Sequence, residues 1–174
     1  MQVKIASFFG GGSGGCVNSP EYLESTSIGQ CLARHGYEVR NGGYRGLMEA
    51  VSKGVSVADG KCVGYTCKSF GYTKGNSYLS ETVVSADIYD RLRHLIDYSN
   101  VLVVHRGSVG TFAELFLAID VNRKKQFPAK IILYGEFWSE MSEHLRSLLG
   151  DDLHSQLSII NSIADLEAIL ASIE

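Results

Sequence analysis

The stretch GSVGT, at residues 107–111, has the composition of a turn that holds a phosphate group. Gly107 and Gly110 let backbone N–H groups approach an anion, and a helix that begins at such a turn presents unpaired amides. Thr111 and Glu114 form the pattern Thr-x-x-Glu. This pattern indicates either a capping box, in which both side chains serve backbone N–H groups, or a threonine that binds the phosphate beside a glutamate that faces the ligand.

Two other glycine-rich turns follow apolar runs, GGGSGG at residues 10–15 and NGGYRG at residues 41–46. Gly10, Gly12 and Gly15 match the dinucleotide pattern G-x-G-x-x-G, but five glycines among six residues match almost any glycine pattern. The acidic residue that an NAD site places at the end of the next strand is also missing. The first turn is therefore either a flexible connection or a ligand contact.

Strands and helices in alternation must position these turns. Six apolar runs predict buried strands, at residues 3–9, 37–39, 62–65, 101–104, 131–134 and 157–160. Helical spacing predicts helices at residues 20–35, 45–54, 81–98, 111–122, 138–149 and 163–173. Ser19 before Pro20, and Ser162 three residues before Asp165, mark two helix starts. Residues 58–78 beyond their strand resemble a surface loop or lid, whose aromatic side chains either cover a sheet edge or stack on a purine.

These elements predict an α/β fold: a Rossmann-like parallel sheet of about six strands with helices on both faces. In such a sheet the loops that leave the carboxyl ends of the strands face the same way, and ligands bind there where the strand order reverses. We therefore expect the three glycine turns to share one edge of the sheet.

Composition excludes several classes of protein. The 174 residues fit one domain, residues 1–174, and a net charge of −3 leaves no broad basic face for nucleic acid. No apolar run approaches the ~20 residues that span a bilayer, and the start MQVKIASFF lacks a basic leader. The four cysteines lack metal-ligand spacing. We therefore expect a soluble cytoplasmic protein with buried thiols and no metal or cofactor.

Longer segments resemble one known family. RNGGYRGLMEAVSKG closely resembles the GGG-x-x-GLM stretch of the Lonely Guy family, and RGSVGTFAE resembles its PGG-x-GT-x-x-E motif. FFGGGSG is similar to that family's opening CGSS-x-G, and DIYDRLRHLIDYSNVLVV has the register of its M-x-x-RK helix and the strand that follows. The correspondence extends over most of the chain, which is identified as a member of this family or its superfamily.

The resemblance implies a homodimer or larger oligomer that hydrolyses the N-glycosidic bond of a nucleoside 5′-monophosphate, of the cytokinin riboside 5′-monophosphate or AMP type. The family's catalytic pair falls on Arg91 and Glu114. A carboxylate stabilises the positive charge that the departing base leaves on the sugar, and a guanidinium holds phosphate or hydroxyl groups. The implied substrate-binding residues are Gly10, Ser13, Gly42, Gly43, Gly46, Arg106, Gly107, Ser108, Gly110 and Thr111.

Several residues depart from the family's pattern. Leu92 replaces a lysine, His105-Arg106 replaces Leu-Pro, Ser108 replaces a glycine of the PGG-x-GT motif, and Asn41 replaces the first glycine of GGG-x-x-GLM. Arg106 is one candidate to replace the lost lysine charge, and His105 is interpreted as a hydrogen-bonded packing residue. Two alternatives therefore stay open: a nucleotide-binding sensor or carrier without turnover, and an NADP-dependent oxidoreductase that uses GGGSGG.

Overall fold

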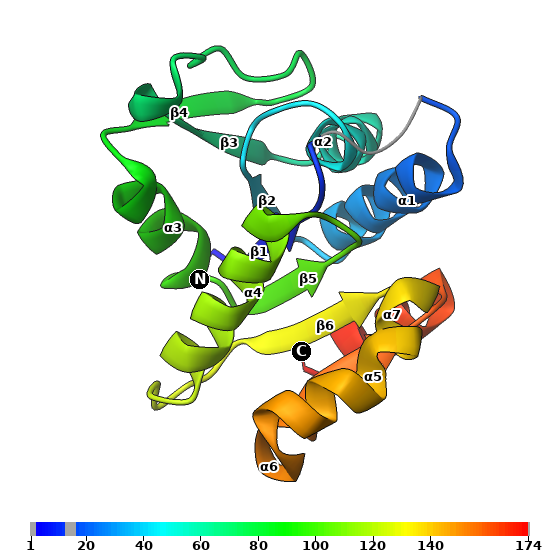
Figure 1. The fold of residues 1–174 in the computed structure, drawn as a ribbon. Coiled ribbons are helices and arrows are strands. Elements are labelled where there is room, and N and C mark those ends of the chain that lie inside the picture. The colour runs from blue at the N-terminus through cyan, green and yellow to red at the C-terminus, as the bar shows by residue number, and fades with distance from the viewer. Residues whose placement is uncertain (1–2, 13–16, 174) are drawn as a thin grey trace.

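A parallel sheet of seven strands forms the centre of the molecule (Figure 1). The computed structural model describes residues 3–12 and 17–173. The strand order is β4-β3-β2-β1-β5-β6-β7. The strands are β1 (Ile5–Phe9), β2 (Glu38–Asn41), β3 (Cys62–Cys67), β4 (Glu81–Ser85), β5 (Val101–Val104), β6 (Lys130–Tyr134) and β7 (Leu157–Ile160). The order reverses between β1 and β5, which is where sheets of this kind bind ligands.

Helices cover both faces of the sheet (Figure 1). They are α1 (Pro20–Arg34), α2 (Leu47–Val57), α3 (Ile88–Ile96), α4 (Val109–Asn122), α5 (Glu136–Leu149), α6 (Asp151–His154) and α7 (Ile163–Ser172), with a 3₁₀ turn at Lys68–Phe70. One hydrophobic cluster joins the sheet to α1, α2 and α7, and includes the fully buried Ile28 and Leu32. A second joins it to α3, α4 and α5, and includes Leu115 and Trp138. The predicted α/β, Rossmann-like class is confirmed, with seven strands rather than about six.

The additional strand is β4, and it shows that the prediction of one helix over residues 81–98 is wrong. β4 pairs in parallel with β3 over its whole length. Because it is an edge strand with one neighbour, most of its side chains are exposed and it lacks the continuous apolar run of a buried strand. Its β-branched residues at positions 82–84 favour a strand. The helix α3 begins only after Asp87, whose side chain accepts a hydrogen bond from the Asp90 N–H at 2.9 Å.

Two predicted helix starts are confirmed. Ser19 Oγ accepts a hydrogen bond from the Tyr22 N–H at 3.3 Å, with Pro20 as the first residue of α1. Ser162 Oγ accepts one from the Asp165 N–H at 3.1 Å at the start of α7. Both bonds satisfy an N–H group that has no partner within its helix.

The cysteines of the described residues are buried and free, as the sequence predicts, at Cys31, Cys62 and Cys67. Cys16 lies outside the described residues. No helix among residues 3–12 and 17–173 is long and apolar enough to cross a membrane.

Candidate functional site

Three loops meet at the carboxyl edge of the sheet, beside the reversal between β1 and β5. Gly11, in the loop after β1, joins them: its N–H donates to the Arg106 carbonyl at 3.1 Å, and its own carbonyl accepts a hydrogen bond from the Leu47 N–H at 3.0 Å. The three glycine turns predicted to share this edge therefore lie against one another. Ser13, a predicted binding residue of the first turn, lies outside the described residues.

Close contacts explain two of the glycines in these turns. Gly46 has a φ of +71°, and a Cβ there would lie 2.6 Å from the carbonyl oxygens of Gly11 and Gly12. A Cβ on Gly107 would collide with the side chain of Thr111. Any other residue at position 46 would push the first two glycine turns apart, and any other residue at position 107 would displace Thr111.

The helix α4 begins at Val109, two residues before the predicted start. Its N-cap is Ser108, whose side chain makes no capping hydrogen bond, and Thr111 is buried in the first turn. Glu114 pairs with Arg91 on another helix, so the capping-box interpretation of Thr111 and Glu114 is wrong. The first N–H groups of an α-helix have no partners within the helix, and its dipole is positive at this end. The turn before α4 can therefore receive an anion.

Arg91 and Glu114 form a buried ion pair between α3 and α4. Arg91 Nη1 lies 3.2 Å from Oε1 of Glu114, and the two side chains are 7% and 14% exposed. Arg91 Nε also donates to the Tyr65 carbonyl at 2.7 Å, which ties the guanidinium to β3. The two residues that the family resemblance implies as a pair are thus in direct contact.

Burial raises the pKa of the Glu114 carboxyl, because an ionised carboxylate loses its hydration there. The charge of Arg91 and its hydrogen bond act in the opposite direction and leave a net upward shift. Carboxyl groups with a raised pKa and one specific cationic partner occur at catalytic sites more often than elsewhere.

A cavity of about 440 Å³ opens beside this pair and extends to the start of α4. Five of the predicted substrate-binding or catalytic residues line it with Arg91, namely Gly10, Ser108, Gly110, Thr111 and Glu114. Apolar and aromatic side chains also line it, including Tyr44, Met48 and Phe70. The cavity therefore suits a ligand with an anionic end and a flat, less polar part.

Tyr44 is a lining residue that the sequence analysis missed. Its ring centroid lies 6.4 Å from that of Phe70 and 5.7 Å from the Arg91 guanidinium carbon. Its hydroxyl accepts a hydrogen bond from the Cys67 N–H at 2.9 Å, which fixes the ring against the end of β3. An aromatic residue inside a glycine turn was the signal that could have identified it.

Gly42 and Gly43 follow β2, and the structure requires glycine at each for a different reason. A Cβ on Gly42 would overlap the Arg91 guanidinium. Gly43 has a φ of +77°, and its N–H donates to Asn41 Oδ1 at 2.7 Å. Asn41 is fully buried, and its Nδ2 donates to Ser52 Oγ at 2.9 Å. This departure from the family's pattern therefore stabilises the turn.

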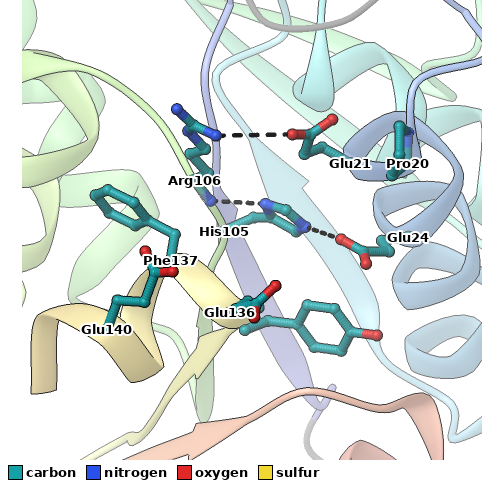
Figure 2. A pocket seen from close by; sticks show the side chains of 10 residues that line it. Pro20, Glu21, Glu24, His105, Arg106, Glu136, Phe137 and Glu140 are labelled. Atoms are coloured by element: carbon teal, nitrogen blue, oxygen red, sulfur yellow. Dashed lines mark hydrogen bonds and ion pairs between the residues drawn. The ribbon is translucent and has the colours of Figure 1, made fainter.

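The side chain of Arg106 lies outside the cavity beside Arg91. It lines a second cavity of about 300 Å³ at the start of α1 and of α5 (Figure 2). Its Nη1 lies 3.9 Å from Oε1 of Glu21, and its guanidinium carbon lies 5.6 Å from the Phe137 ring centroid. The structure therefore does not place Arg106 where it would replace the lost lysine.

Comparison with protein families and curated proteins points to nucleotide-related proteins. The model of the SLOG cluster4 family matches residues 4–155. A pyrimidine/purine nucleotide 5′-monophosphate nucleosidase of Escherichia coli (strain K12) is 25% identical over 165 residues. The match covers 84% of this chain and 36% of the nucleosidase, so the chain spans about a third of that relative's length.

Two solved structures share the whole fold. The molybdenum cofactor binding protein from Rippkaea orientalis has a TM-score of 0.79 at 24% identity, over 99% of this chain and 98% of its own. The molybdenum cofactor carrier protein from Chlamydomonas reinhardtii has a TM-score of 0.78 at 21% identity, with the same coverage. At these identities the likeness shows a common architecture.

Proposed function

Because the chain belongs to the SLOG cluster4 family, we propose that it binds a nucleoside 5′-monophosphate beside Arg91 and Glu114 and hydrolyses its N-glycosidic bond. This membership confirms the resemblance to Lonely Guy-type proteins. The nucleosidase among its relatives supports a nucleotide ligand. The observation that carries the proposal is the buried ion pair, 3.2 Å apart, on the wall of a cavity that reaches the N-terminus of α4.

The geometry supports a division of roles within this cavity. The phosphate binds the first N–H groups of α4 together with Thr111. Glu114 stabilises the positive charge that develops on the sugar as the base departs, or orients the attacking water. Arg91 donates from its guanidinium to sugar or phosphate oxygens, and its charge favours the ionised form of Glu114. The base lies against the aromatic wall at Tyr44 and Phe70.

Incubation with AMP and with isopentenyladenosine monophosphate tests this proposal directly. We expect free base and ribose 5-phosphate in equal amounts, measured by liquid chromatography, because both products come from one hydrolytic step. Tight nucleotide binding without release of base would reject the hydrolase. Retention of NADPH without AMP binding would instead support the oxidoreductase.

A carrier or sensor of the same fold is the second candidate function. Two observations favour it: Leu92 stands where the family has a lysine, and two of the three guanidinium nitrogens of Arg91 already have partners within the protein. The first removes a positive charge from the site, and the second occupies donors that could otherwise bind a ligand. The cofactor-binding proteins that share the fold make a carrier role compatible with this architecture.

Replacement of Tyr44 by alanine is expected to raise the KM for AMP about tenfold with a smaller change in kcat, because base–aromatic stacking contributes ~1–3 kcal/mol. Steady-state kinetics on purified protein measure both constants. Tyr44→Phe is the matched control, since it keeps the ring and loses only the hydrogen bond from Cys67. Equal KM values in wild type and Tyr44→Ala would place the base elsewhere.

We propose that the protein is a homodimer or larger homo-oligomer that associates through α3 and α4. A groove between these helices is lined by the apolar Tyr89, Leu92, Ile96, Leu117 and Val121 together with the charged Arg93 and Asp97, and Tyr89 is 75% exposed. Exposed apolar side chains gathered in one place favour an interaction site there.

We expect Leu117→Glu to shift the protein to a monomer, because a buried charge without a partner opposes association. Light scattering coupled to gel filtration measures the mass. The exposed Leu148 on α5 provides a matched control, and Leu148→Glu is expected to leave the mass unchanged. A wild-type monomer at micromolar concentration would contradict the proposal.

A further inference from the structure

Both ring nitrogens of His105, which follows β5, form hydrogen bonds: one with the next residue and the other with α1 (Figure 2). Nδ1 accepts a hydrogen bond from the Arg106 N–H at 2.6 Å, so this nitrogen carries no proton. The proton is therefore on Nε2, which donates to Glu24 Oε2 at 2.9 Å. Burial lowers the pKa of the imidazole against the opposing effect of Glu24, which favours this neutral form.

Both backbone polar groups of Arg106 have hydrogen-bond partners. Its N–H donates to His105, and its carbonyl accepts a hydrogen bond from the Gly11 N–H at 3.1 Å. Gly107 and Ser108 follow directly and lead into α4. The orientation of the start of α4 relative to the loop after β1 therefore depends on how Arg106 is held.

The hydrogen bond to Arg106 compensates for a departure from the family's motif. This chain has His105-Arg106 where the Lonely Guy motif has Leu-Pro. Proline has a restricted φ and no N–H, whereas arginine has an N–H group and a freer backbone. An N–H that is partly shielded from water is stabilised by a hydrogen-bond partner within the protein. His105 Nδ1 is that partner, and the bond restricts the orientation of the peptide.

We propose that His105 is a positioning residue for the phosphate-binding turn, oriented by Glu24 and acting through the Arg106 N–H. The inference rests on the proposed function, since its effect on a ligand requires phosphate to bind at α4. The Tyr134 ring stacks on the imidazole at 5.6 Å and restricts its orientation. Neither His105 nor Glu24 belongs to the described residues that line the cavity beside Arg91. Their effect therefore reaches the nucleotide through the turn.

His105→Leu and His105→Asn separate this role from simple packing. Leucine fills much of the imidazole volume but has no acceptor, whereas asparagine places Oδ1 near the position of Nδ1. If His105 only fills space, the smaller and polar asparagine is the more damaging replacement. If His105 positions the turn, leucine is the more damaging replacement. We expect the KM for AMP to rise about fivefold in His105→Leu at nearly unchanged kcat, and to return to within about twofold in His105→Asn.

Amide hydrogen exchange, followed by NMR without nucleotide, provides a second readout. We expect the Arg106 N–H to exchange at least about fivefold faster in His105→Leu than in wild type, and to recover in His105→Asn. Unchanged protection in His105→Leu, or a lower KM in that variant than in His105→Asn, would overturn the inference. Should His105→Leu fail to fold, His105→Gln replaces it in both readouts, because its amide extends past the position of Nδ1.

The exchange measurement distinguishes failure of this inference from failure of the proposed function. Absence of AMP binding and cleavage would reject the function alone, and the protection of the Arg106 N–H would still decide the role of His105. Faster exchange in His105→Leu with recovery in His105→Asn supports the positioning role in either case.

Discussion

Replacement of Glu114 by glutamine is expected to reduce the rate of base release from AMP by at least about a hundredfold. The amide keeps the size of the side chain but cannot offset the positive charge that develops on the sugar, and removal of one such group typically costs ~10²–10³ in kcat. Nucleotide affinity is expected to be unchanged or tighter, because the phosphate meets one negative charge fewer. Single-turnover kinetics measure the rate, and calorimetry measures the affinity.

The control for Glu114→Gln is Glu140→Gln, since Glu140 is exposed and lines the other cavity. Its kcat should equal that of wild type. A kcat within about threefold of wild type for Glu114→Gln would show that the carboxylate takes no part in the reaction. Loss of AMP binding in this variant would assign Glu114 to substrate binding.

The raised pKa of Glu114 also predicts in which direction the activity of the wild-type enzyme changes with pH. Because the ionised carboxylate is the active form and its pKa is raised above the usual 4.5, activity should be lost as pH falls through a value above 4.5. Arg91 lowers this pKa, so removal of its charge should move the acidic limb to still higher pH. A pH–rate profile that stays flat down to pH 4 would contradict this assignment.

Replacement of Arg91 by methionine is expected to lower the free energy of unfolding by about 3 kcal/mol at neutral pH. Loss of one partner leaves Glu114 as a buried charge without compensation, and breaking a buried pair in this way costs ~3–5 kcal/mol. Urea denaturation followed by circular dichroism measures the change. The matched control is Arg146→Met on α5, because Arg146 is exposed and pairs with exposed carboxylates, so this change should alter stability by less than ~1 kcal/mol.

The double variant Arg91→Met with Glu114→Gln tests the cause of this destabilisation. It removes both charges, so most of the lost stability should return. The sign of the pH effect follows from the raised pKa of Glu114: the penalty in Arg91→Met is absent while the carboxyl is protonated and grows as pH rises through its folded-state pKa. Equal destabilisation at pH 5 and pH 8 would indicate lost packing instead.

Much of the fold could be predicted because it depends on residues close together in the sequence. Continuous apolar runs indicated six of the seven strands, and Ser19 and Ser162 marked two helix starts. β4 was missed because an edge strand packs against one neighbour and shows no buried pattern of its own. Its three β-branched residues favour a strand, but the hydrogen bonds to β3 that establish it form between distant parts of the sequence.

Some residues of the site were predicted from the sequence, and others were missed or misplaced. Register with the family motif identified Arg91 and Glu114, and the structure places them in contact. Tyr44 was missed, because only the approach of the second glycine turn to β3 brings its ring to the cavity. The side chain of Arg106, expected near the ligand, instead pairs with Glu21, because the turn that begins at His105 directs it toward α1.

The sequence by itself determined the alternation of strands and helices and the glycine turns between them, because period, backbone freedom and cap residues act within a few positions. Only the tertiary structure decided which partner each polar group takes. A threonine followed by a glutamate three residues later suits a capping box as well as a binding site, and the two cannot be ranked from local pattern. Packing of α3 against α4 buries Glu114 beside a guanidinium 23 residues away in sequence, and that charge outcompetes a backbone N–H for the carboxylate.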